Sequence, residues 1–105
     1  MAFSSRLERS DGTALITLVG ELDAASASLF KEEVERAATT QVDRLVLLMK
    51  DLTYIASAGL RVLIFAKQKM GARVEIYIIG AQEQVVDTLQ KTGFDRSCTM
   101  QDTYA

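Results

Sequence analysis

The turn that organises this chain reads Tyr54-Ile55-Ala56-Ser57-Ala58-Gly59-Leu60-Arg61-Val62-Leu63. Its β-branched and aromatic start is typical of a strand, and its small residues lead into an apolar stretch of helical length, Leu60 to Met70. We expect Ser57 to be the N-cap of this helix, because serine is favoured at that position. The helix carries too many apolar residues for one solvent-exposed face, so we expect it to be largely buried.

Upstream, the chain is predicted to begin with a β-hairpin. Asp11-Gly12 is a strong tight-turn dipeptide between two β-rich runs, Phe3 to Arg9 and Thr13 to Val19. Gly20 is expected to end the second strand, because glycine is depleted within strands.

An amphipathic helix is predicted to follow, from Ala24 to Ala38, with Asp23 or Ser26 as its N-cap. Glu32, Glu33 and Glu35 share this helix with Lys31 and Arg36. This pattern indicates a solvated face, and we expect neither paired catalytic carboxylates nor a metal site there.

The remaining elements alternate between strand and helix. Arg44 to Met49 is a nearly continuous apolar run that suits a central strand, the third in the chain, and Arg73 to Ile79 is predicted as the fourth strand. Gln82 to Thr92 has a helical apolar face with Gly93 as its stop, and a weak strand follows at Ser97 to Met100.

The order ββαβαβαβ predicts the α/β class, with a mixed sheet of four to five strands covered by about three helices. The 105 residues show no linker or repeat and suit a single domain, residues 1–105. We expect that domain to be a monomer when it is free.

Composition argues against several classes of function. A net charge of −2 and a pI near 5.1 provide no broad positive field, so we expect neither nucleic acid nor a membrane surface as partner. No apolar stretch is long enough to cross a bilayer, and the first residues lack a secretion signal, which favours the cytoplasm. With no His and the single Cys98, we expect no catalytic dyad, metal or cofactor, and Cys98 is expected to be a buried, inert thiol.

Ser57 is the hydroxyl on which a chemical role depends. A helix N-terminus carries unsatisfied N–H groups and a partial positive charge, so a phosphoryl group on Ser57 would be tolerated by the fold. A partner pressed against the same spot would instead have to bury about 1.5–2 negative charges. One phosphate could therefore abolish binding, although from the residues alone a plain N-cap role is the simpler explanation of the serine.

The segment from Tyr54 to Leu63 resembles the signature of the STAS domain family, and specifically its stand-alone bacterial anti-sigma factor antagonists. Gly20-Glu21-Leu22-Asp23 resembles a second element of that family, the turn before the first helix, and Thr92-Gly93-Phe94 resembles a third. The resemblance extends over nearly the whole chain.

This resemblance implies a partner switch. The unmodified protein would bind an anti-sigma factor that is also a serine kinase, phosphorylation of Ser57 would release it, and a PP2C-type phosphatase would remove the phosphate; the protein itself would not be an enzyme. The expected partner-binding residues are Asp23, Ile55, Ala56, Ser57, Ala58, Gly59, Leu60 and Arg61. Many relatives carry a polar residue at the positions of Ala56 and Ala58, which is a departure of this chain.

Three alternatives remain open from the sequence. The same fold could serve another signalling or secretion complex, or a transporter-associated complex, without a sigma factor output. An enzyme with Ser57 as nucleophile would need a base other than His. Arg61 could neutralise a phosphate on Ser57, meet a partner carboxylate or simply be solvated.

We also expect an exposed patch around Ile55 and Leu60 to be the surface that binds the partner.

Overall fold

Five strands form one mixed sheet in the order β1-β2-β3-β4-β5, with β1 and β2 antiparallel and every other pair parallel. The computed structural model describes residues 2–71 and 73–104. The elements in chain order are β1 (Ser4–Ser10), β2 (Thr13–Leu22), α1 (Ala27–Ala37), β3 (Arg44–Ile55), α2 (Ser57–Met70), β4 (Glu75–Ile79), α3 (Glu83–Thr92), the 3₁₀ helix η1 (Phe94–Ser97) and β5 (Thr99–Gln101). The predicted α/β class, element order and central position of β3 are confirmed.

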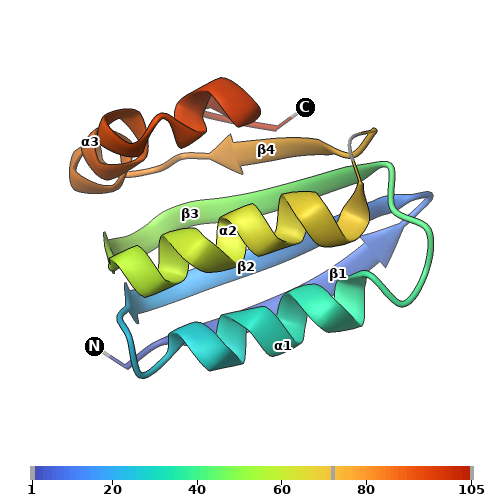
Figure 1. The fold of residues 1–105 in the computed structure, drawn as a ribbon, viewed down its shortest axis with the longest axis horizontal. Helices are drawn as coiled ribbons and strands as arrows, with labels where there is room; N and C mark the ends of the chain where they lie inside the picture. The colour runs from blue at the N-terminus through green and yellow to red at the C-terminus, as the bar shows by residue number, and fades with distance from the viewer. Residues whose placement is uncertain (1, 72, 105) are drawn as a thin grey trace.

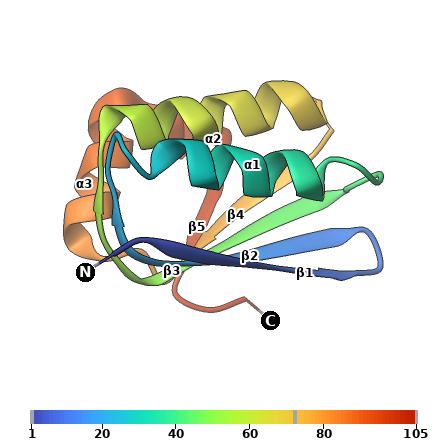
Figure 2. The same ribbon diagram turned by 90° about the horizontal axis from the view of Figure 1, so that it is seen from below.

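Helices α1 and α2 lie side by side over one face of the sheet (Figures 1 and 2). Their apolar residues pack on the alternate side chains of the strands, so that Phe30 and Leu63 are fully buried against Ile16 and Leu47 in one core. Both views place α3 near the end of the sheet from which α1 and α2 start. That end of the molecule carries the candidate site.

Strands β2 and β3 are longer than the sequence predicted, and Gly20 does not end β2. Gly20 adopts φ +93°, a conformation that glycine enters without a steric penalty, and the β2–β3 register shifts on both sides of it. The ladder then continues until Leu22 pairs with Ile55. This extension brings the ends of two parallel strands, and the loops that follow them, to the same edge of the sheet.

Smaller differences occur at other boundaries. Helix α1 begins at Ala27 and not at Ala24, because three turn residues precede it. Strand β5 starts at Thr99, since Ser97 belongs to the 3₁₀ helix. The prediction that the glutamates of α1 lie on a solvated face is also partly wrong. Glu33 is buried, and its carboxylate is paired with the guanidinium of Arg36.

Candidate functional site

Ser57 is the first residue of α2 and not its N-cap. Ala56 occupies the N-cap position in an extended conformation, and Leu60 N–H donates to Ala56 O over 3.1 Å. The Ser57 side chain is exposed, and its hydroxyl makes no hydrogen bond with any residue that the structure describes. The helix thus begins without a side-chain cap, and the Ser57 hydroxyl is left available to another molecule.

The loop of Asp23 lies directly beside the start of α2. Ala56 N–H donates to Leu22 O over 2.8 Å, which ties the two loops together. Asp23 and Ser26 hold each other: Ser26 N–H donates to Asp23 Oδ1 over 2.9 Å, and Asp23 N–H donates to Ser26 Oγ over 2.9 Å. Ser26 is the N-cap residue of α1, but its side chain makes no capping hydrogen bond to the helix. The reciprocal pair instead closes the turn that precedes α1.

Asp23 is exposed, and its bonds favour the ionised carboxylate. The Ser26 backbone N–H, and next the Ser26 hydroxyl, hold the pKa of Asp23 below its ordinary value. The loop that carries Asp23 lies next to the start of α2, so this carboxylate adds a negative charge to the same edge of the sheet.

The expected exposed patch around Ile55 and Leu60 is wrong. These side chains are only 4% and 7% exposed, because both belong to the core beneath α2. Gly59 is buried with them, and a Cβ at Gly59 would lie 2.8 Å from Cγ and Cδ2 of Leu22. Ile55 and Gly59 thus set the close approach of α2 to the sheet and support the surface from below.

The accessible apolar surface lies further along α2. Ile64 is 48% exposed, so the prediction of a largely buried α2 is wrong on this side. It borders a groove of about 370 Å³ between α2 and the segment that follows α3. The groove is lined by Ser57, Leu60, Arg61, Ile64, Thr92, Gly93, Phe94 and Ser97.

The turn at Thr92-Gly93-Phe94 could be predicted from the sequence, but its position opposite α2 could not. Only the packing of α3 and η1 at the edge of the sheet brings this turn to the groove. Of the expected partner-binding residues, Ser57, Leu60 and Arg61 line the groove, and Ala56 and Ala58 are half-exposed beside it.

Other features offer less for chemistry. Cys98 is half-buried, and burial raises the pKa of its thiol to about 11, which suits an inert side chain. Among residues 2–71 and 73–104, no cluster of three or more His, Cys, Asp or Glu side chains could hold a metal ion. None of the described helices is long and apolar enough to cross a membrane.

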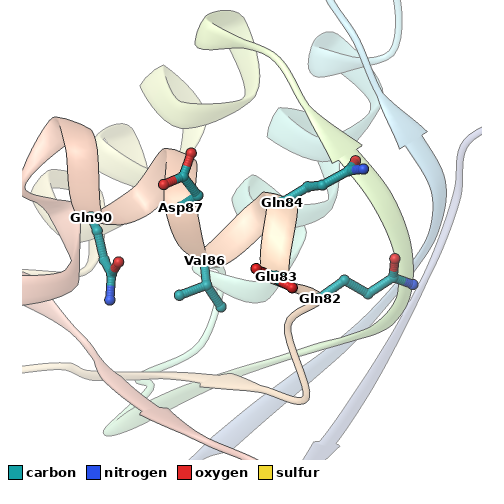
Figure 3. Close-up of a pocket in the computed structure, with 6 residues that line it drawn as sticks. All are labelled: Gln82, Glu83, Gln84, Val86, Asp87 and Gln90. Atoms are coloured by element: carbon teal, nitrogen blue, oxygen red, sulfur yellow. The ribbon is translucent and has the colours of Figure 1, made fainter.

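A second hollow follows the outer side of α3. Figure 3 shows that its side chains are spread along the helix and do not converge on one point. Its lining residues are Gln82, Glu83, Gln84, Val86, Asp87 and Gln90. None of the residues predicted for the site belongs to this hollow.

The STAS domain model matches residues 4–105. The chain belongs to the STAS domain family. Comparison with curated protein sequences gave no significant match.

Solved structures share the fold at low sequence identity. An anti-sigma factor antagonist from Mycobacterium paratuberculosis superposes with a TM-score of 0.87 at 19% identity, covering 97% of this chain and 87% of that chain. A putative anti-sigma factor antagonist from Thermotoga maritima gives 0.84 at 22% identity, covering 94% and 86%. The anti-sigma factor antagonist SpoIIAA in its unphosphorylated form gives 0.76 at 19% identity, covering 96% and 90%.

Proposed function

We propose that this STAS domain is an anti-sigma factor antagonist. In the proposal, the unphosphorylated form binds an anti-sigma factor that is also a serine kinase, and phosphorylation of Ser57 releases the two proteins. The observation that carries the proposal is the exposed Ser57 hydroxyl, free of hydrogen bonds within the described chain, at the start of α2 and beside an apolar groove.

The chemistry requires no catalytic residue from this protein. The kinase would bring ATP, and the Ser57 oxygen would form a bond to the γ-phosphorus while the bond from that phosphorus to the bridging oxygen breaks. ADP leaves, and a base of the kinase takes the hydroxyl proton. A PP2C-type phosphatase would later hydrolyse the phosphoester to serine and inorganic phosphate. The protein would thus be a substrate and a binding partner, and not an enzyme.

The position of Ser57 explains why one phosphate could change binding without unfolding the domain. A phosphoryl group at the first turn of α2 faces free backbone N–H groups and the positive end of the helix dipole. A partner covering Ser57 would have to desolvate about 1.5–2 charges. A penalty of about 2.7 kcal/mol already corresponds to a hundredfold loss of affinity, and burial of unpaired charge can exceed it.

The departures from the family pattern are compatible with this role. Ala56 and Ala58 leave Ser57 as the single hydroxyl between Ile55 and Arg61, so a kinase would have one acceptor in this turn. The structure of a related fold, the Bacillus cell fate determinant SpoIIAA in the phosphorylated form, superposes with a TM-score of 0.71 at 17% identity and covers 92% of this chain and 90% of that chain. That likeness is in fold, and it supports the compatibility of this architecture with a phosphorylated state.

The test is affinity capture from the native host with four baits: the unmodified protein, Ser57→Ala, Ser57→Asp and Ser28→Asp. Ser28 is an exposed serine in the first turn of α1, so its replacement adds the same charge near another helix start. We expect a serine kinase to be retained by the unmodified protein and Ser28→Asp and lost from Ser57→Asp. With ATP, the captured kinase should phosphorylate the unmodified protein and leave Ser57→Ala unlabelled.

Equal capture by Ser57→Asp and the unmodified protein would contradict the switch. That result would favour the alternative of a constitutive STAS subunit in another signalling, secretion or transporter-associated complex. If a kinase is captured but its deletion releases no sigma factor, the phosphorylation switch would stand and the sigma factor output would be wrong.

A further inference from the structure

The groove beside Ser57 combines an apolar floor with one charged side chain. Its apolar lining residues are Leu60, Ile64 and Phe94, of which Ile64 is the most exposed, and Arg61 is the only residue with a formal charge among those that line it. A groove of about 370 Å³ with this lining suits an apolar side chain of a partner. A carboxylate close to that side chain would complement Arg61.

Arg61 is available for such a contact. Its side chain is exposed, and it makes neither an ion pair nor a hydrogen bond with the described residues. In contrast, Arg6, Arg36 and Arg44 are each paired with a glutamate. The charge of Arg61 is therefore not used in holding the described fold together.

Arg61 is also within reach of Ser57. The two residues are four positions apart in α2, so their Cβ atoms lie about 5–6 Å apart on one face of the helix. Side chains on a helix lean toward its N-terminus, which directs Arg61 to Ser57. A guanidinium can bind a phosphate through two parallel hydrogen bonds.

We infer that Arg61 changes partner when Ser57 is modified. In the unmodified protein Arg61 binds a carboxylate of the kinase segment whose apolar side chain occupies the groove, and after phosphorylation it binds the phosphate on Ser57. This inference rests on the proposed function and specifies its regulation. The phosphate then acts twice, by adding charge where the kinase docks and by removing the cation that held the kinase.

The first test needs no kinase. Phosphoserine is incorporated at position 57 by genetic encoding, and the second pKa of the phosphate is measured by ³¹P NMR. Free phosphoserine titrates near pH 6, and a nearby guanidinium favours the dianion. We expect the pKa to rise by about 0.2–0.4 pH unit in Arg61→Gln and to stay unchanged in Arg96→Gln. Arg96 is an exposed arginine of η1 that does not line the groove.

The second test measures the affinity of the captured kinase for unphosphorylated variants. We expect Arg61→Gln to weaken binding by about 10-fold, as for loss of one charge pair at an interface, and Arg61→Lys to recover part of it. Ile64→Asp should weaken binding at least as much, and Arg96→Gln should bind normally. Circular dichroism of each variant checks that the fold is retained.

The outcomes separate this inference from the proposed function. An unchanged phosphate pKa in Arg61→Gln, or normal kinase binding by Arg61→Gln while Ser57→Asp fails to bind, overturns the role of Arg61 and leaves the Ser57 switch intact. Normal kinase binding by Ser57→Asp overturns the proposed function itself, whatever the behaviour of Arg61.

Discussion

Gly59→Ala tests the close packing that positions the start of α2. In a helix this change alone should stabilise the protein, because alanine has a helix propensity about 1 kcal/mol better than glycine. Here the new methyl carbon would lie 2.8 Å from Cγ and Cδ2 of Leu22 and 3.0 Å from Cγ1 of Ile55. Ordinary carbon contacts are about 3.5–4.0 Å, and both neighbours are buried in the core.

The expected net effect follows from these opposing contributions. Overpacking a core by one methyl group costs about 1–3 kcal/mol, and the gain in helix propensity offsets about 1 kcal/mol of it. We expect Gly59→Ala to lower the free energy of unfolding by about 1 kcal/mol. For a domain of this size, that corresponds to a fall in Tm of about 4–8 °C.

The assay is thermal and urea unfolding followed by circular dichroism, with Ala58→Gly as the calibration of helix propensity at the neighbouring position. A double-mutant cycle with Leu22→Ala identifies the clash, because Leu22→Ala removes the two nearest atoms that the new methyl meets and leaves only the 3.0 Å contact with Ile55 Cγ1. In that background Gly59→Ala should be neutral or stabilising, giving a coupling energy of about 1–2 kcal/mol. A higher Tm for Gly59→Ala in the unmodified background would refute the packing argument.

Three further predictions concern the same end of the molecule. Leu63→Ala should destabilise the fold by about 2–5 kcal/mol because Leu63 is fully buried, whereas Ile64→Ala should cost about 1 kcal/mol or less because Ile64 is half-exposed. Urea unfolding of the two variants measures the difference. Equal losses of stability would mean that α2 is rotated about its axis relative to this structure. Folding lowers the pKa of Asp23, so the ionised carboxylate contributes stability above its unfolded pKa, and this stability is lost as the pH falls through its folded pKa. Asp23→Asn should therefore lose less stability than the unmodified protein between about pH 5 and about pH 2. Identical dependence of unfolding on pH in the two proteins would contradict the role of the Ser26 bonds. The thiol of Cys98, with its pKa raised to about 11, should react with iodoacetamide at pH 8 about 100-fold more slowly than a thiol of ordinary pKa 9.0, because only the thiolate reacts. Rapid labelling of Cys98 in the folded protein would contradict this shift in pKa.

The architecture could be predicted from the sequence because its local signals agree with one another. Asp11-Gly12 adopts positive φ at both residues, as expected of a two-residue hairpin turn, and Gly93 ends α3 in a left-handed conformation. The predictions that were wrong concern places where tertiary contacts override a local sequence preference. Gly20 was predicted to end β2, but pairing with β3 carries the strand through it to Leu22.

The position of Ser57 at the start of a helix could be predicted from the sequence, whereas the exposed surface around it could not. Ser57 and Asp23 could be singled out from motifs, and parallel strands that end together bring their loops to one edge. The apolar surface was misplaced at Ile55 and Leu60, since burial of an apolar residue after a strand depends on what packs there. Ile64 is 48% exposed and lines a groove that no other element of the described residues fills.

The central claim is that Ser57 is the phosphorylated residue of a binding switch. The most direct measurement is the intact mass of the protein isolated from its native host, before and after phosphatase treatment, with fragmentation to locate any modification. We predict a fraction carrying one phosphoryl group on Ser57, removed by phosphatase and absent from Ser57→Ala. A protein whose Ser57 stays unmodified in every growth condition would contradict the claim.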